Sequence, residues 1–438
     1  MSTARPLTRA ARREARLTAT AERLDRLALP ESGGWLGRAR EAAIDRLRGL
    51  GLPERRDEYW RFTNPAPFLA EETPQAEVFQ ITDEPIVFES VDRLKIVFVD
   101  GVFDAGASDD LAAEGLEICR LSEAGAADIH WAQDLYGVLE ARGHDPVARP
   151  FAPLNTAMAG DGVLIRASGK VSRPVSLIYR RRDTRAEAVL HHVIRIEPGA
   201  EMTLLENGPV AARFSVVTEA SIAKGGMLHH VRAQGRDHQR SGITHLFARL
   251  EADAGLKSFT LSANGRVLRN EAVLWLDGEG GSAHVAGAAM GDGDFHHDDT
   301  VFVTHGAPRC ESRQVFKKVL RGGAVGVFQG KILVDQVAQL TDGYQISQSL
   351  LMDERSQFLA KPELEIYADD VKCSHGSTSG EIDADQLYYL RARGIDAGEA
   401  TNLLVLAFLS EALDEIARED LAEDIRSRLE GWLARHRG

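Results

Sequence analysis

Cys373 and His375 are the two residues whose types and spacing could do chemistry together. They stand two positions apart in D-D-V-K-C-S-H-G-S-T-S-G, a run of turn-forming residues from position 369 to 380. If the backbone here is extended, both side chains lie on the same face, close enough to bind one metal or to share a proton. A thiolate with an imidazole suits iron, an iron–sulfur cluster or zinc.

Two alternatives stay open for this pair. A catalytic Cys–His pair also needs an oxyanion hole and an orienting third group, and the sequence offers no candidate for either. The second alternative is structural: a partly buried cysteine next to a hydrogen-bonded histidine in a loop. The local sequence does not choose among these interpretations, so the rest of the chain has to.

The cysteine count limits what the pair could hold alone. The chain has three cysteines, Cys119, Cys310 and Cys373, too far apart for a C-x-x-C zinc site or a disulfide framework. Iron–sulfur clusters usually take four protein ligands, mostly thiolates. A cluster at Cys373 or His375 would therefore need ligands from a partner. We expect Cys119 and Cys310 to be buried small side chains, and the cytoplasm to be the natural compartment.

Other motifs give little support to other chemistry. The sequence has no Walker A motif, no H-E-x-x-H and no G-x-S-x-G, and G-E-G-G-S-A at 278–283 has further glycines where a phosphate-binding helix should follow. Adjacent strand residues face opposite ways, so in a histidine doublet one ring should line the interior and the other should meet solvent. A metal site that joins His296 or His297 to His305 is an alternative. The doublets are His191/His192, His229/His230 and His296/His297.

Composition and charge exclude two broad classes of protein. The net charge of −14 over 438 residues argues against a general nucleic-acid binder, which needs a basic face. No apolar run approaches the ~18 residues of a membrane span. The arginine-rich N-terminus predicts an amphipathic helix that continues through Leu24, in preference to a transit peptide.

The middle of the chain predicts a solenoid. Residues 1–150 read as a helical and α/β region with a buried strand at 94–99, and 151–380 read as a mainly β core. In this core, turn glycines recur in steps of 24 to 30 residues, which favours stacked coils over the alternative of a β-sandwich. The glycines are Gly199, Gly225, Gly255, Gly280, Gly306 and Gly330.

Residues 381–438 predict a small helical domain that binds a partner. Asp383 and Asp396 are N-cap candidates, and Gly394 is a helix stop between them. The run 403–409 is apolar nearly all round, which is more than one core face requires. A third helix places a single apolar stripe on Leu421, Ile425, Leu429, Trp432 and Leu433.

Six motifs follow one another along the chain, at 57–63, 296–314, 326–334, 336–345, 361–376 and 387–395. In this order they resemble the SufB/SufD family of iron–sulfur assembly proteins. The resemblance is strongest after residue 290, and within the family the SufD branch is the more similar one. The first motif, D-E-Y-W-R-F-T, resembles the family's E-x-W-x-Y-T element, with Phe62 in place of the tyrosine.

The resemblance implies a fold and a role. The fold would be a right-handed parallel β-helix with N-terminal α/β and helical elements and a C-terminal helical domain. The role would be that of a non-catalytic scaffold subunit, which pairs with SufB through the β-helix and docks the SufC ATPase through its C-terminal helices. ATP would then bind only to SufC. The residues expected on the SufC side are Tyr388, Tyr389, Arg393, Leu404 and Phe408.

The resemblance also implies a role for the opening pair. His375 falls on a histidine that lies across from a SufB cysteine at the nascent-cluster site, and Cys373 falls on its neighbouring cysteine. The transient cluster would be shared with SufB, with His375 as the direct ligand and Cys373 as an auxiliary ligand or a metal-responsive thiol. Reduced flavin is a further expected component of the complex. The isolated chain could form a homodimer through the edge meant for SufB.

Two alternatives to this assignment differ in class. A SufB-type paralogue would carry a cysteine-rich N-terminal motif and acidic residues around the C-terminal histidine, and both are absent here. A β-helix lyase or hydrolase acting on acidic polysaccharide would present clustered Asp, Arg or Lys in a groove, and it would cleave a polymer on its own. We expect the isolated chain to be catalytically silent.

Overall fold

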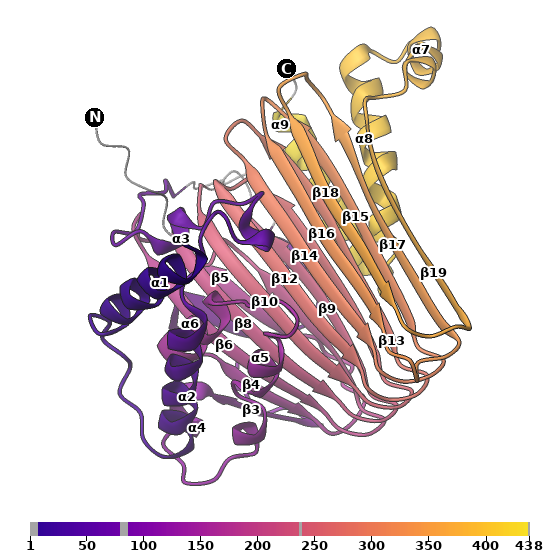
Figure 1. The fold of residues 1–438 in the computed structure, drawn as a ribbon. Coiled ribbons are helices and arrows are strands. Elements are labelled where there is room, and N and C mark those ends of the chain that lie inside the picture. The colour runs from indigo at the N-terminus through magenta and orange to yellow at the C-terminus, as the bar shows by residue number, and fades with distance from the viewer. Residues whose placement is uncertain (1–7, 79–85, 236–238, 437–438) are drawn as a thin grey trace, which may run out of the picture.

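The chain forms a parallel β-solenoid of two sheets stacked face to face (Figure 1). The computed structural model describes residues 8–78, 86–235 and 239–436. From residue 163 onward the chain alternates between the sheets, and register partners in successive coils lie 26 to 32 residues apart. This confirms the predicted β-helix and its period, and excludes the β-sandwich.

Sheet A runs from the last coil back to the first. Its strands pair in parallel, except that its final two are antiparallel. The pairing leaves the strand of residues 371–380 at one edge of the sheet. In order the strands are β19 (Val371–Gly380), β17 (Thr341–Leu351), β15 (Glu311–Arg321), β13 (Ser282–Asp292), β11 (Gly255–Ala263), β9 (Met227–Gln234), β7 (Glu201–Asn207), β5 (Val175–Arg180), β1 (Leu94–Val99) and β2 (Val102–Phe103).

Sheet B lies opposite and is built the same way. Its last pair is also antiparallel, which ends the regular stacking at the N-terminal side. At the other side the sheet ends on a strand with one neighbour. In order the strands are β18 (Gln357–Ile366), β16 (Val325–Val334), β14 (His296–His305), β12 (Val267–Leu276), β10 (Ser241–Leu250), β8 (Arg213–Ile222), β6 (Glu187–Ile196), β4 (Val163–Ala167) and β3 (Leu116–Arg120).

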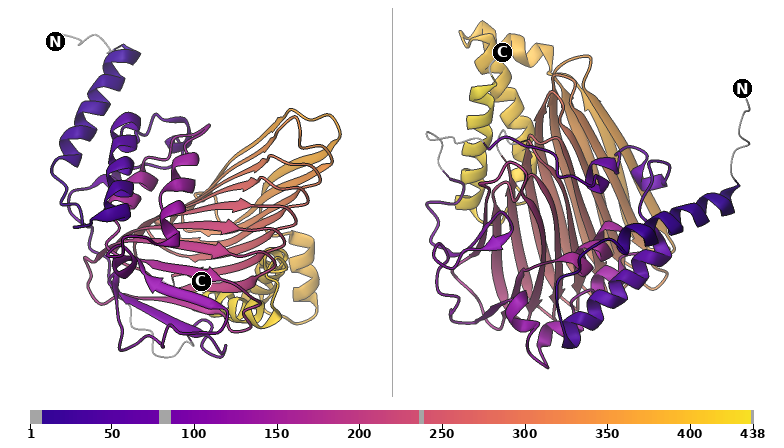
Figure 2. Two further views of the ribbon diagram at one scale, coloured as in Figure 1. Left: turned by 90° about the horizontal axis from the view of Figure 1, so that it is seen from below. Right: turned by 90° about the vertical axis from the view of Figure 1, so that its left-hand side faces the viewer.

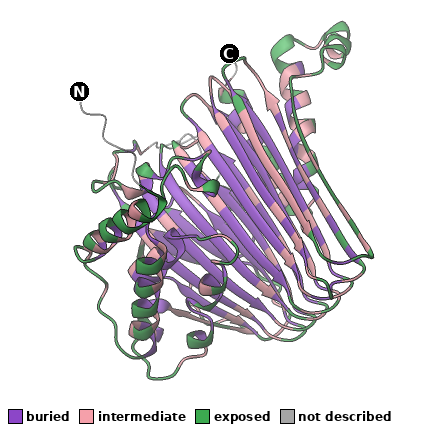
Figure 3. Ribbon diagram, viewed as in Figure 1, coloured by how far each residue is buried: buried purple, intermediate pink, exposed green. Residues whose placement is uncertain are grey.

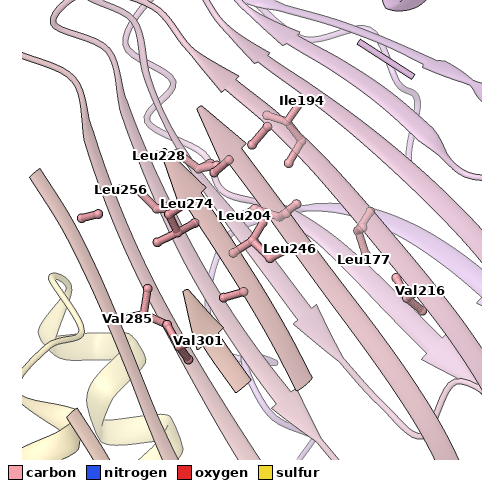
Figure 4. Packing of buried hydrophobic residues seen from close by; sticks show 14 of the residues in the cluster. Leu177, Ile194, Leu204, Val216, Leu228, Leu246, Leu256, Leu274, Val285 and Val301 are labelled. Carbon is pink, nitrogen blue, oxygen red and sulfur yellow. The ribbon is translucent and has the colours of Figure 1, made fainter. Parts of the chain in front are cut away.

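The interior between the sheets is a continuous apolar core. Alternate residues of each strand point inward and stack on the equivalent residue of the next coil, as Leu228 of β9 and Leu256 of β11 do (Figure 4). A coil buries this face only against its neighbours, which is why the apolar pattern repeats with the coil.

Glycine marks some of the turns as predicted, and not others. Gly199, Gly225 and Gly280 have positive φ between strands, where glycine is favoured. The prediction of a turn at Gly330 is wrong, because Gly330 lies inside β16 and faces inward. A Cβ there would lie 2.3 Å from the Gln345 side-chain oxygen, so the position needs a residue without a side chain. Gly255 opens β11 and is likewise not a turn residue.

The N-terminal segments cover the outer face of sheet B, and the C-terminal helices lie on the opposite side of the solenoid (Figure 2). The predicted amphipathic N-terminal helix is confirmed as α1, which ends at Leu24. The covering elements are α1 (Arg9–Leu24), α2 (Gly34–Leu50), η1 (Glu58–Trp60), α3 (Ala66–Leu69), α4 (Leu121–Ala124), η2 (Trp131–Asp134), α5 (Val138–Arg142) and α6 (Phe151–Met158).

The family-like element at 57–63 fixes the N-terminal segment to sheet B. Trp60 packs under the Arg269 guanidinium, 4.3 Å from ring to carbon, and the Thr63 hydroxyl donates to Asp298 at 2.5 Å. Tyr59 donates to Glu363 of β18, and Lys361 lies 3.8 Å above the Tyr59 ring. This element therefore reaches the last coil of sheet B from the other end of the chain.

A buried ion cluster lies under this element. Glu271 accepts from Arg269 at 2.8 Å and from Arg149 at 3.0 Å, and Arg269 also pairs with Asp298. All four side chains are buried. Burial alone would raise the pKa of Glu271, but the charges of Arg269, His245 and Arg149 outweigh it and lower the pKa to about 2.

The histidine doublets follow the expected alternation only in part. His192, His230 and His297 point inward, where His192 bonds Tyr179 at 3.1 Å and His297 bonds Lys318 at 2.9 Å. The prediction that each outward ring meets solvent is wrong for His191, which is fully buried against Tyr136 because the N-terminal segments cover it. The alternative histidine metal site is also wrong, because His305 bonds Ser312 and no group of three potential ligands forms among the described residues.

Three C-terminal helices follow the solenoid. Asp383 and Asp396 cap the first two as predicted, and the stripe from Leu421 to Leu433 is buried as predicted. The second and third helices pack on the outer face of sheet A and share one apolar cluster with it, whereas the first projects beyond the sheets, as Figure 1 shows. The helices are α7 (Ala384–Ala392), α8 (Ala397–Leu413) and α9 (Glu419–Arg435).

The sheets cross the predicted domain boundary at 150, and an apolar cluster crosses the one at 380. Strands β1, β2 and β3 come from residues 1–150 and extend both sheets, while residues 151–158 form helix α6. The outer face of sheet A shares its core with the C-terminal helices. The division into three domains stays a prediction about folding units. No helix in the described ranges is long and apolar enough to cross a bilayer.

We expect Glu271→Gln to lower the free energy of unfolding by about 3 kcal/mol at pH 7, because it leaves Arg149 buried without a carboxylate. The folded-state pKa of Glu271 is depressed, so its contribution is complete above the ordinary value of about 4.5 and is lost as pH falls toward 2. Urea unfolding of both proteins at pH 7 and at pH 3 measures this. A difference in stability that grows on acidification would contradict the ion cluster.

Candidate functional site

The last coil leaves both sheets with an open edge. Strands β18 and β19 each pair with one strand of the described chain, β16 and β17 respectively. Their other backbone N–H and C=O groups are therefore available to another strand. The two strands are also less buried than those of earlier coils, as Figure 3 shows by its pink and green segments at this end.

Cys373 and His375 lie on β19, not in a loop. The turn-forming composition of residues 369–380 suggested a loop as one alternative, but pairing with β17 holds the segment extended. Cys373 is opposite Gly343 and His375 is opposite Gln345. In-register partners of parallel strands point the same way. Cys373 with Gly343, and His375 with Gln345, therefore each continue a column of stacked side chains that runs along the solenoid.

Both columns point into the interior. The Gln345 side chain reaches Gly330 of the opposite sheet, and the Cys373 sulfur packs with Ile332 and Val334. Cys373 and His375 are thus neighbours on the inward face, two residues apart, at the end where the interior opens. This is the placement that the sequence predicts for an extended backbone.

The chemical state of the pair is set by its exposure. His375 is exposed, and no hydrogen bond or ion pair joins its ring to the described residues. Cys373 is half-buried, and burial raises the pKa of its thiol above the ordinary value despite a bond from the Gly343 backbone. The pair therefore offers one exposed imidazole, together with a thiol whose raised pKa keeps it protonated at neutral pH.

The chain does not complete a metal site around this pair. Within residues 8–78, 86–235 and 239–436, no three His, Cys, Asp or Glu side chains are placed to hold one ion. Two donors fall short of the four that an iron–sulfur cluster usually takes. The geometry agrees with the ligand shortage expected from the cysteine count.

A polar layer behind the pair was missed by sequence reasoning. Gln314 and Gln345 are fully buried in the column that ends at His375, and their side-chain amides have no partner in the described structure. Ser347 bonds Ser377 at 3.1 Å in the next inward column. The signal was available, because Gln314, Gln345 and His375 are one coil apart in sequence. The interior next to the open end is therefore polar.

The residues expected on the SufC side fall into two groups. Tyr388 and Tyr389 of α7 are 75% and 55% exposed, and the Arg393 guanidinium lies 3.3 Å from the Tyr389 ring. No residue of α7 is buried, and all but Leu387 and Leu390 are exposed. Leu404 is partly buried, and Phe408 packs against the cluster on sheet A, 4.6 Å from the Lys317 ammonium. Phe408 therefore already has a structural role within the chain.

The other two cysteines lie away from the open end. Cys310 is 1% exposed and its thiol is 3.3 Å from the Gly278 carbonyl oxygen, as expected of a buried small side chain. Cys119 is half-buried, 3.4 Å from His130, and burial raises the pKa of its thiol to about 11. Neither thiol is near Cys373 in the coil order.

Comparison with known proteins gives two matching family models. The model described as "SUF system FeS cluster assembly, SufBD core domain" matches residues 179–408, and "SufBD protein N-terminal region" matches 26–177. The first covers the solenoid from β5 onward together with α7 and most of α8.

Individual relatives match over nearly their whole length. The chain is 28% identical to the iron–sulfur cluster assembly protein SufD of Escherichia coli over 400 residues, 88% of this chain and 90% of that protein. It is 24% identical to SufD of Bacillus subtilis over 422 residues, covering 90% and 93%. A SufBD family protein of Synechocystis is 26% identical over 410 residues, covering 88% and 89%.

We expect iodoacetamide to alkylate Cys373 before Cys119 and Cys310 in the folded chain. Cys373 is half-buried at the open end, whereas Cys310 is enclosed and the Cys119 thiol has a pKa of about 11. Peptide mass spectrometry over a time course at pH 8 measures the three rates, with the urea-unfolded chain as the control in which they converge. Slower labelling of Cys373 than of Cys310 would show that the end is closed.

Proposed function

Because this chain belongs to the SufBD family of iron–sulfur cluster assembly proteins, we propose that it is a SufD-type scaffold subunit that contributes one side of a shared cluster site. The observation that carries the proposal is the inward pair Cys373 and His375 at the open end of the solenoid. Its own catalytic chemistry would be absent, and the nascent cluster would be cargo.

The donor count supports a shared site. A partner that closes the open end would bring further thiolate or carboxylate ligands to the free imidazole of His375. Cys373 is the second donor, and metal binding would displace its proton. The polar layer of Gln314 and Gln345 would supply hydrogen-bond donors next to cluster sulfurs, which tune such clusters.

The partner at this end would be SufB. Strands β18 and β19 offer two free edges side by side, and a second solenoid of the same family has matching edges to pair with them. Pairing there would continue both sheets and cover the interior. A homodimer of the isolated chain would use the same edges.

The SufC ATPase would dock on the other exposed element, α7. Tyrosine and arginine side chains are common energetic centres of protein interfaces, and Tyr388, Tyr389 and Arg393 stand together on a helix with no buried residue. ATP would bind to SufC alone. Reduced flavin bound to the assembled complex, and a cytoplasmic setting, complete the proposal.

The polysaccharide-cleaving alternative finds no exposed charged groove where the covering segments lie on the outer faces of the two sheets in the described structure. Its charged residues would line an exposed groove on a sheet face, but the N-terminal segments cover sheet B and helices α8 and α9 cover sheet A. The charged cluster on sheet B that includes Arg149 and Glu271 is buried. The solenoid faces therefore favour assembly over polymer binding.

We expect His375→Ala to remove or shift the visible absorption of a cluster reconstituted anaerobically on the chain co-expressed with SufB and SufC. His375 is exposed, so the substitution should leave the complex intact. The matched control is Ser377→Ala, two residues along the same inward face. An intact His375→Ala complex with an unchanged spectrum and unchanged iron–sulfur enzyme activity in cells would exclude His375 as a ligand.

We expect Tyr388→Ala and Tyr389→Ala to weaken SufC binding by about 2 kcal/mol each, roughly 30-fold in Kd. Both side chains are exposed, so the melting temperature of the isolated chain should stay unchanged. Titration calorimetry with SufC measures the affinity, and Arg426→Ala on the exposed side of α9 is the control. Equal affinities for all variants would place the SufC contact elsewhere.

A further inference from the structure

A basic pocket lies on the side of the solenoid away from the open end. Its volume is about 560 Å³, within the range of small-molecule sites. Strand β1, the end of β5, the segment that follows β7, and Gly235 directly after β9 form its walls. One wall requires glycine: Gly208 has φ of 113°, and a Cβ there would lie 1.9 Å from the Tyr179 carbonyl oxygen.

Five cations line this pocket without a carboxylate partner. None of Arg93, Lys95, Arg180, Arg181 and Arg182 has a carboxylate oxygen of the described residues within 4.0 Å. Arg181 donates only to backbone carbonyls, of Glu77 and Gln239. Such a gathering of unpaired cations is unexpected in a chain with a net charge of −14.

Arg93 is the most unusual of the five. It is 3% exposed, and its buried Nε and Nη1 have no hydrogen-bond partner. Burial lowers the pKa of Arg93, and the carboxylates of Glu89 and Asp424 offset this only from beyond ion-pair distance. A buried guanidinium without a partner is costly to the fold, so Arg93 points to an anionic partner that residues 8–78, 86–235 and 239–436 do not supply.

A second pocket of the same protein contains a buried arginine, Arg213, that has both a carboxylate and a backbone partner. This pocket, about 740 Å³, lies in the seam between the N-terminal helices and sheet B. Its buried Arg213 makes two bonds of 2.8 Å to Glu187 and donates to the Ala70 carbonyl. Other buried arginines, such as Arg40 and Arg149, also have one unpartnered nitrogen, but each makes other hydrogen bonds, whereas Arg93 makes none in the described structure.

We propose that the basic pocket binds a small molecule with two or more phosphoryl or carboxyl groups. Guanidinium groups match the planar oxygen pairs of these anions in a two-bond geometry, and five arginines line the pocket. Ile86, Ile178 and Pro209 would contact the carbon part of the molecule. The buried Asn207 side-chain oxygen also lacks a partner and would accept from a hydroxyl. This site is independent of the cluster site.

The test uses titration calorimetry of the full chain with pyrophosphate and with citrate at constant ionic strength. We expect binding of at least one of them with 1:1 stoichiometry, and which of the two binds identifies the phosphoryl or the carboxyl class. Acetate, with one charge, should bind at least about 10-fold more weakly, since it can satisfy only one cation. Failure of both pyrophosphate and citrate to bind at millimolar concentration would overturn the proposal.

Substitutions locate the binding. Arg93→Gln should weaken the affinity for the anion about 10-fold or more. Arg355→Gln, which changes an exposed arginine in the turn after β17, should leave the affinity unchanged. Without ligand, Arg93→Gln should not lower the melting temperature, because it removes an unpaired buried charge; a purely structural arginine would lower it. If that variant does not fold, Arg180→Gln with Arg182→Gln replaces it. Affinity unchanged by either set would overturn the site.

Discussion

Every coil of this solenoid depends on the next coil for its backbone hydrogen bonds and for cover over its inward side chains. At the N-terminal side the antiparallel strands β2 and β3 end the regular stacking, whereas at the C-terminal side β18 and β19 have no following coil in the described chain. The candidate ligands Cys373 and His375 lie on the final strand, facing the uncovered interior. The candidate ligands thus lie on the coil that has no following coil to pair with its strands and cover its inward side chains.

The helices that cover the outer sheet faces leave the C-terminal end of the solenoid as the part open to a partner. The outer face of sheet B is closed by the N-terminal segments over a buried ion cluster, and that of sheet A by α8 and α9. Glu58 pairs with Lys361 at 2.6 Å and Tyr59 bonds Glu363, so the N-terminal segment also braces the outer side of β18. A partner can therefore extend the sheets at the end without displacing a helix from either face.

The fold could be predicted from sequence because its determinants are periodic. Turn glycines and alternating apolar residues repeat with the coil, and an extended backbone at Cys373 and His375 was enough to place both on one face. The prediction of a turn at Gly330 was wrong because glycine is required there for another reason: the Gln345 side chain on the opposite sheet leaves no room for a Cβ. The prediction for His191 was wrong because Tyr136, which is distant in sequence, covers its ring. The basic pocket could not be predicted, because no local sequence pattern relates β1, β5, the segment after β7 and Gly235. Sequence periodicity predicts the stack, but not what the outer segments bury.

The exposed edges also limit which partner can use them. An open strand edge invites any free strand, and proteins commonly restrain it with charged and polar residues. Here β19 carries Lys372 and a run of serine, threonine and glycine, and β18 carries Lys361, Glu363 and Glu365. Non-specific pairing of another strand through apolar side chains is therefore disfavoured. A partner gains from this edge mainly backbone hydrogen bonds and polar contacts, so it must match the register of two strands at once. That requirement fits the proposed partner, another solenoid of the same family, which would bring its own last coil close to the His375 side chain.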